Sequence, residues 1–507
     1  MTLETPSGTR PPRREGKAGE TMKGKKRFPL LTILVAVSLA ISPAACVSPP
    51  SYDYGDIRRE YADTLCRLAP LEGGQGDTAS CAVNRPVTLE SAIEIALANS
   101  PDKMMALSRI RSADAAIQRA GAAFYPAVSV YTEYTEGDAP SAYLFKAIDQ
   151  RKLPPNTNFN DPGKIENFES GIQARINLFN GGRDLLRRRM AETGRTEAEL
   201  ARQEVENGLA ASVISAYYNA LAARRFIAIA RESVTTVESQ LRVMNVRFKA
   251  GGALKSDILS LDVRLAEARE SQVRAENHWK TALIALAEVM GVSPDPPIPL
   301  KETSSLSVPV PAGYMEGLTR ALARRPELER VRQTVVRSRM ALDMARAAYL
   351  PRVDLQGKYY LDDESMAYEL DRDNWTVGLM VNWDLFTGFS RDAGIREAEA
   401  VLEERLSADR KTLLSIKADV KNAYFALDAA EARLKVADAS VAAAEESLDL
   451  VKAQYEGGSA TITRYLEAEL DRNRARTRAT AAFYDREKAR ADLARAVGHW
   501  ATPKDRR

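Results

Sequence analysis

This chain of 507 residues contains three cysteines, whose thiols could be lipidated or form a disulfide. Cys46 follows Ala44-Ala45, after an apolar run from Leu30 to Ile41 that basic residues precede. A basic region, a short apolar region and small residues at the cut are typical of an export signal. The sequence therefore predicts a signal over residues 1–45 and lipidation of Cys46. The alternative is ordinary signal-peptidase cleavage nearby, which leaves Cys46 unmodified.

If Cys46 is acylated, two cysteines remain, Cys66 and Cys81. Both lie in residues 46–86, which are expected to form an N-terminal periplasmic segment. Exported chains meet an oxidising compartment, so we expect these two cysteines to form a disulfide. Met22 opens a signal of ordinary length. We therefore expect translation to start there, with residues 1–21 as an upstream extension.

The remaining residues give no support to catalysis. The two histidines, His278 and His499, are far apart in the sequence, and no nucleophile, base and orienting group stand out together. The formal net charge is only +3, and the basic residues of the signal account for it. Nucleic-acid binding would need a basic face. We expect no enzyme activity, no cofactor, no metal and no nucleic-acid partner.

The elements that carry the function are built twice. Residues 96–126 return as 321–351 with a shift of 225, and the segments that begin at Leu178 and Leu385 agree with a shift of 207. The difference of 18 residues lies between Pro126 and Leu178. Such a duplication indicates one structural unit made twice. We expect repeat 1 at 87–291, a linker at 292–312, repeat 2 at 313–498 and a tail at 499–507.

Two proline-free stretches, Arg183–Ala250 and Arg391–Glu456, predict helices of about 65 residues, roughly 100 Å long. In the second, apolar residues recur every seventh position from Leu406 to Tyr455, with a second line three places later that is rich in alanine. This pattern is typical of a coiled-coil seam. Glycine turns end both stretches, and further helices run back over about 255–290 and 461–497. The sequence thus predicts two helical hairpins whose tips carry Gly251, Gly252, Gly457 and Gly458.

Upstream of each long helix, the period changes to strict alternation, within 127–178 and within 352–386. Trp375, Val377 and Leu379, for example, alternate with Thr376 and Gly378. Four strands of about ten residues with one apolar and one polar face suit an outer-membrane barrel. An open sheet of four strands cannot lie in a bilayer, because its edges would be unpaired. Three copies would supply twelve strands. The predicted fold is mainly α with transmembrane β: a trimeric α-barrel of helical hairpins and a shared β-barrel.

The signal, the tandem repeat, the corners at Pro126 and Pro351, the Leu-Phe-x-Gly corners at Leu178 and Leu385 and the glycine tips together resemble the TolC-like outer-membrane efflux family. The resemblance covers about residues 87–498, and Ala45-Cys46 is similar to the lipidated, OprM-like branch. It implies a homotrimer in the outer membrane of a Gram-negative bacterium, with a long periplasmic extension. It also implies two protein partners, a periplasmic adaptor (membrane fusion protein) and an inner-membrane pump of RND or ABC type.

The family closes its tunnel at the helix tips. On this resemblance, Asp257 matches an acidic gate residue, Tyr455 matches the tip tyrosine, and Glu467 matches one acidic position. Arg464 stands where the family has a gate aspartate, and an Arg464–Asp257 ion pair would restore a lock. The alternatives are solvated charges at Asp257 and Arg464, and plain packing for Tyr455 and its counterpart Phe248. The glycine turns are helix caps, and the resemblance adds a contact with the adaptor.

Two kinds of protein fit a long coiled coil with an export signal. One is a passive export duct of a tripartite efflux or type I secretion system. The other is a periplasmic scaffold or adaptor without a pore. Only the duct explains four amphipathic strands, and its cargo, small molecules or polypeptides, stays open. The polar stretch between Gly137 and Phe168 is expected to form an outer loop that narrows the mouth.

Overall fold

The computed structural model describes residues 86–295, 297–302, 309–367 and 370–500, with the isolated residues Gly55 and Arg59. The predicted signal, the lipidation at Cys46 and the disulfide between Cys66 and Cys81 lie outside these residues. Nearly all described residues belong to the second of two compact units, Gln75–Arg507. No helix in these ranges is both long and apolar enough to cross a bilayer.

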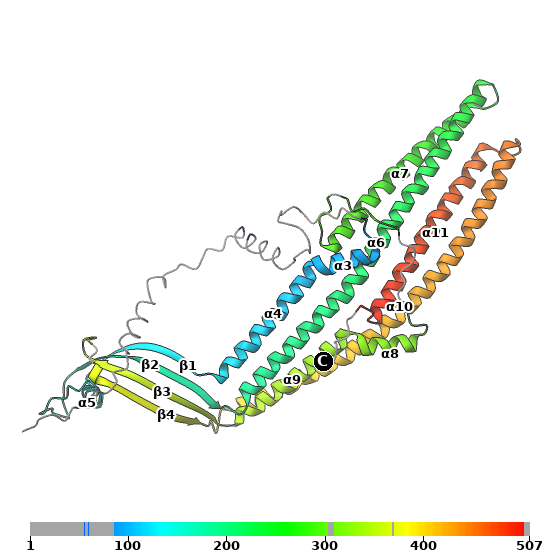
Figure 1. Ribbon diagram of the computed structural model, residues 1–507. Coiled ribbons are helices and arrows are strands. Elements are labelled where there is room, and N and C mark those ends of the chain that lie inside the picture. Colours follow the sequence, from blue (N-terminus) through cyan, green and yellow to red (C-terminus); the bar gives the residue numbers. More distant parts are fainter. Residues whose placement is uncertain are drawn as a thin grey trace, which may run out of the picture. The chain divides into compact units, whose positions relative to one another are not determined.

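The duplication is visible in the order of the elements, which is helix, helix, strand, strand, long helix and returning helix in both copies (Figure 1). The first copy holds α3 (Leu89–Asn99), α4 (Pro101–Gly121), β1 (Ala127–Gly137), β2 (Ile165–Phe179), α6 (Arg183–Lys249) and α7 (Lys255–Met290). The second holds α8 (Tyr314–Arg324), α9 (Pro326–Arg346), β3 (Arg352–Asp363), β4 (Asp373–Asn382), α10 (Ser390–Glu456) and α11 (Ile462–Ala496). Between its strands the first copy has the helix α5 (Pro140–Asp149), within the predicted insertion, whereas the described part of the second copy has the short 3-10 helix η4 (Leu370–Arg372) at that place.

Prolines and glycines set the boundaries of these elements. Pro101 and Pro326 occupy the first turns of α4 and α9, where the missing N–H has no cost. Gly251 and Gly458 have φ of 74° and 77° just beyond α6 and α10, the left-handed conformation that glycine adopts most easily. Each long helix therefore ends sharply and is followed by a helix that runs back along it.

The four strands form one antiparallel sheet in the order β1-β2-β3-β4, so the central pair β2 and β3 joins the two copies. Within this sheet Gln173 lies opposite Ser129 and Lys358, and Lys358 lies opposite Thr376. Since side chains alternate along a strand, these residues share one face and their apolar neighbours share the other. The predicted division into a polar and an apolar face is confirmed.

The long helices pair as predicted, α6 with α7 and α10 with α11 (Figure 1). Near the tips their shared core contains Val237, Met244, Leu261, Leu448 and Val451. The predicted seam is less complete toward the sheet, where Leu406 is half exposed within one protomer. A seam residue without a covering helix in its own chain is expected where the covering helix comes from another copy.

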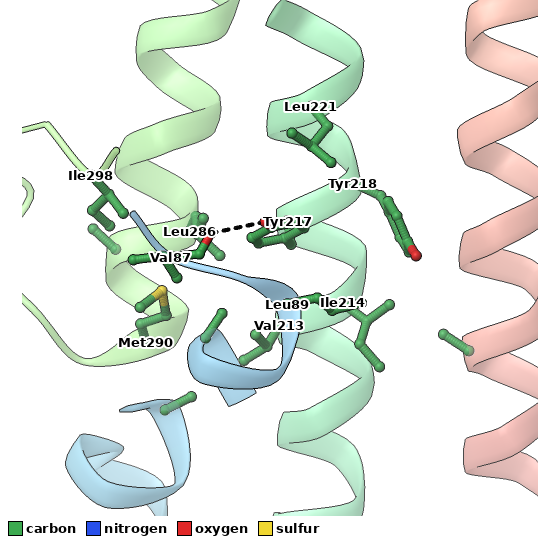
Figure 2. Close-up of a cluster of buried hydrophobic side chains, with 14 of the residues drawn as sticks. Val87, Leu89, Val213, Ile214, Tyr217, Tyr218, Leu221, Leu286, Met290 and Ile298 are labelled. Atoms are coloured by element: carbon green, nitrogen blue, oxygen red, sulfur yellow. Dashed lines mark hydrogen bonds between the residues drawn. The ribbon is translucent and has the colours of Figure 1, made fainter. Parts of the chain in front are cut away.

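A larger core holds the short helices against the long ones. Figure 2 shows Tyr217 of α6 among Val87, Leu89, Leu286 and Met290, all fully or almost fully buried. The Tyr217 hydroxyl, whose bond to Val87 is dashed there, lies 3.0 Å from the Val87 carbonyl oxygen and 2.5 Å from that of Lys301. A single phenol thereby ties the start of the first copy and the linker to α6.

The same device recurs in the second copy. Tyr424 of α10, which lies 207 positions after Tyr217, has its hydroxyl 2.9 Å from the carbonyl oxygens of Pro311 and Gly313. The neighbouring Gly317 leaves room for this ring, because a Cβ there would lie 2.5 Å from the Tyr424 hydroxyl. The repeats thus share a clamp as well as a fold.

Candidate functional site

The apolar face of the sheet is unusually bare for a protein surface. Trp375 is 72% exposed and Val377 65%. Four more large apolar side chains on this face are about half exposed or more: Val128, Val130, Leu379 and Val381. A contiguous patch of this kind marks a partner or a membrane. A row of valines and leucines with tryptophan near the strand ends is typical of a lipid-facing barrel wall.

The opposite face is polar and internally paired. Asp354 of β3 accepts a hydrogen bond of 2.9 Å from Asn177 and forms ion pairs with Arg175 at 3.2 Å and Arg352 at 2.8 Å. Three partners leave this buried carboxylate well satisfied. A wall with this composition is suited to water, and it would be costly against lipid.

Within the described part of the chain, the sheet has two unpaired edges. β1 and β4 are its outer strands, and each is hydrogen-bonded there to one neighbouring strand. An exposed edge with an apolar face beside it is a template for further strand pairing. Because successive strands alternate in direction, β4 of one copy would run antiparallel to β1 of the next.

The helix tips hold the predicted gate residues, and there the predicted ion pair does not form within a single protomer. Arg464 Nη1 lies 3.4 Å from Glu467 Oε2 on its own helix. Asp257 Oδ2 accepts a hydrogen bond of 3.2 Å from the Leu254 N–H at the start of α7. Residues three apart on one helix meet with little loss of entropy, whereas Arg464 and Asp257 belong to different hairpins. Arg464 and Asp257 are therefore each engaged locally.

Tyr455 and Phe248 occupy unlike surroundings although they match in the repeat. Tyr455 is 8% exposed, and its ring stacks on Tyr465 with centroids 5.6 Å apart and carries the Arg247 guanidinium at 5.3 Å. Phe248 is partly exposed at the end of α6. Tyr455 therefore packs between the hairpins, and Phe248 lies on the protomer surface. Gly251 and Gly458 have open space around them, whereas a Cβ at Gly457 would lie 3.3 Å from the Ala453 carbonyl oxygen and one at Gly252 3.6 Å from that of Arg247.

A charge network between the hairpins escaped the sequence reading. Glu232 of α6 forms ion pairs with Arg472 at 3.1 Å and Arg476 at 3.0 Å, both on α11, and Arg476 also pairs with Glu445 of α10 at 2.7 Å. The spacing of the two arginines, one turn apart on α11, was the signal available in the sequence. This network links three long helices below the tips.

Beside this network lies a carboxyl that is almost completely buried. Glu469 is 1% exposed, and its Oε2 has no hydrogen-bond partner among the described residues. Burial raises the pKa of Glu469, and the nearby Arg472 and Arg264 guanidinium groups oppose that rise. Asn473 contributes one long hydrogen bond of 3.4 Å. Burial thus favours the protonated form of this carboxyl more than at a surface glutamate.

The chain is similar to known export proteins over most of its length. It is 25% identical to the pyoverdine export outer membrane protein OpmQ of Pseudomonas aeruginosa over 382 residues, 75% of this chain and 78% of that protein. It is 28% identical to the protein CyaE of Bordetella pertussis over 395 residues, 77% and 80% of the two chains. The alkaline protease secretion protein AprF of Pseudomonas aeruginosa is 28% identical over 200 residues, 38% of this chain and 41% of that protein.

Solved structures share the fold. The Campylobacter jejuni CmeC outer membrane channel superposes with a TM-score of 0.71 at 16% identity and covers 85% of this chain and 91% of its own. The outer-membrane channel OprN superposes with a TM-score of 0.69 at 19% identity, over 90% and 100% of the two chains. The predicted fold class, long helical hairpins joined to a small antiparallel sheet, is confirmed.

The model of the outer membrane efflux protein family matches residues 92–292 and 317–499, which correspond to the two copies of the repeat. The bare apolar sheet face, the paired polar face behind it and the doubled hairpins agree with that match. The predicted export duct and its outer-membrane location are confirmed, and the alternative of a pore-less periplasmic scaffold is set aside. The chain belongs to the outer membrane efflux protein family.

Proposed function

We propose that three copies of this chain close into one twelve-stranded barrel, and that their hairpins form a tunnel continuous with it. The observation that carries the proposal is the unfinished sheet, with an apolar face bare and the edges of β1 and β4 unpaired. In lipid every backbone N–H and C=O needs a partner, which a barrel without edges provides. The half-exposed seam residue Leu406 supports contacts between copies along the helices as well.

The duct passes its cargo without chemical change, and an inner-membrane pump of RND or ABC type, reached through a periplasmic adaptor, supplies the energy. Relatives named for pyoverdine export and for alkaline protease secretion support either small-molecule or polypeptide cargo. The adaptor would dock at the hairpin tips, where Gly251, Gly252, Gly457 and Gly458 keep side chains out of the way. Lipidation of Cys46 would add an anchor in the outer membrane.

The gate lies at the same tips. Tyr455, packed between Tyr465 and Arg247, would hold the second hairpin against the first in the closed state. Asp257, Arg464 and Glu467 would complete the closure across neighbouring copies, where charges from different hairpins face each other. Phe248, partly exposed on the protomer, would be covered by the adjacent copy.

Mild detergent extraction of the outer membrane, followed by native mass measurement, tests this assembly. The expected mass is three chains, each with acyl groups at Cys46. A monomer that needs no detergent would contradict both the barrel and the membrane location. A trimer without acyl groups would contradict the lipidation alone.

A further inference from the structure

The helix α5, which has no α-helical counterpart in the described part of the second copy, lies at one end of the strands (Figure 1). Lys146 Nζ forms ion pairs with Glu169 Oε2 of β2 at 2.6 Å and with Asp362 Oδ1 of β3 at 2.9 Å. Glu169 lies four residues from Gln173 on β2, and Asp362 lies four residues from Lys358 on β3. Side chains an even number of residues apart on a strand point to the same side, so Glu169 and Asp362 lie on the polar face. The loop helix is therefore attached to the water-facing side of the wall.

A second set of hydrogen bonds holds the end of α5. Gln150 Nε2 donates to Asn167 Oδ1 at 2.8 Å, and Asn167 Nδ2 donates to Asp362 Oδ1 at 2.6 Å. Gln150, Asn167 and Asp362 are each at most 1% exposed. Buried polar groups that satisfy one another give a defined position. The helix is thus fixed to the sheet and does not hang free as a surface loop would.

The side of α5 that faces away from the sheet exposes large apolar side chains. Phe145 is 69% exposed and Ile148 46%, three positions apart and so on one side of the helix. The charged Lys146 and the buried Ala147 and Gln150 face the wall instead. This is the reverse of an ordinary amphipathic surface helix, whose charges face solvent. The Phe145–Ile148 stripe therefore needs a second apolar surface.

From this geometry we infer that α5 is an inward-folded outer gate, in which the Phe145–Ile148 stripes of three copies meet around the barrel axis. The inference rests on the proposed trimer, because only closure of the sheet turns its polar face, and α5 with it, toward a common axis. The occupant of each stripe is then the same stripe of the other two copies, continuous with the β1–β4 closure. An apolar constriction blocks water and ions by dewetting. The trimeric channel would then close at both ends, at the periplasmic tips and at the outer mouth.

Access to the lumen from outside the cell tests the gate separately from the periplasmic tips. A Gln173→Cys substitution places a thiol on the polar face, four residues farther along β2 than Glu169. Intact cells receive a polymer-linked maleimide or a small charged maleimide, and the reaction of the introduced thiol is measured as a mass shift against the parent chain. The polymer-linked reagent is expected to react slowly in the otherwise unchanged protein.

Two variants should open the mouth. The double substitution Phe145→Ser and Ile148→Ser makes the stripe polar, and Lys146→Met releases α5 from Glu169 and Asp362. Each is expected to raise the rate of polymer labelling several-fold. The matched controls are Phe159→Ser, an exposed apolar residue of the same segment outside α5, and Lys152→Met, whose partner Glu364 is exposed. Both controls should leave the rate unchanged.

The outcomes separate the gate from the channel. The comparison is between the protein that carries Gln173→Cys alone and the variants added to it. Polymer labelling that is equally fast in all of them, or slow in all of them while the small reagent reacts, would overturn the gate and leave the channel standing. If the small charged reagent never reacts but a lipid-soluble maleimide does, the polar face does not line water, and the proposed channel fails with the gate. Phe145→Cys offers a direct check, since copies that meet at the axis should form disulfide-linked dimers on oxidation.

Discussion

A lysine at Val377 should prevent stable insertion of the barrel, whereas a lysine at the next residue should be tolerated. Val377 lies in the middle of β4, on the apolar face, and is 65% exposed in the protomer. Gly378 lies on the polar face opposite Gln356, and a Cβ there would meet nothing within 4 Å. The two positions therefore share depth and strand and differ in the face that they present.

The expected difference follows from the cost of charge in lipid. A lysine on the lipid face at the bilayer midplane costs about 2–4 kcal/mol. Three copies place three such lysines in one barrel, for a total of roughly 6–12 kcal/mol if the sites are independent. That is comparable with the entire stability of an ordinary domain. Val377→Lys should therefore abolish the trimer, and Gly378→Lys should cost only the small effect of a lumen substitution.

The assay compares the two variants in outer-membrane fractions. The amount of trimer that survives extraction is measured on gels without heating, and its resistance to urea is measured by the loss of that band. Survival of the Val377→Lys trimer at parent levels would refute the assignment of the faces. Equal loss in both variants would show that the strand tolerates no lysine at all and that the face is irrelevant.

Three further predictions concern the helices. Asp257→Ala combined with Arg464→Ala should raise the resting conductance of the trimer in planar bilayers, and an unchanged conductance would reject their part in the gate. Tyr217→Phe removes the hydroxyl donor that the Lys301 carbonyl oxygen shares with that of Val87, which keeps the Lys301 N–H. It should lower the free energy of unfolding by about 1–3 kcal/mol, more than Tyr424→Phe at the partly exposed equivalent site; equal denaturant midpoints would contradict this. Because burial raises the pKa of Glu469, the native trimer holds this proton to a higher pH than the unfolded chain and loses stability as the pH rises from the ordinary carboxyl range through the raised pKa. Glu469→Gln should be more stable than the parent at neutral pH and less dependent on pH, as thermal melts at several pH values would reveal.

The hairpins and the strands could be predicted because their signals are local and doubled. Gly251 and Gly458 end two helices of the same length, and alternation around Val377 is a direct consequence of the pleat. The two shifts place the insertion between Pro126 and Leu178, where the structure has it, but the sequence predicts only a polar loop where the structure has α5. Pro140 begins α5 at the position where proline is favoured, and that was the available signal.

The candidate sites could be predicted less well, because their contacts join distant parts of the chain. Lys146 and Asp362 are 216 residues apart and belong to different copies of the repeat, so no period in the sequence connects them. The Arg464–Asp257 pair does not form within the protomer for a related reason. Glu467, one turn along the same helix, is a partner that Arg464 can reach without any tertiary contact.

Electron cryomicroscopy of the detergent-extracted particle tests the central claim most directly. The predicted map has threefold symmetry, with β4 of each copy hydrogen-bonded to β1 of the next and with the polar strand faces around a water-filled lumen. A particle in which β1 and β4 keep free edges, or in which the apolar faces point inward, would contradict the account.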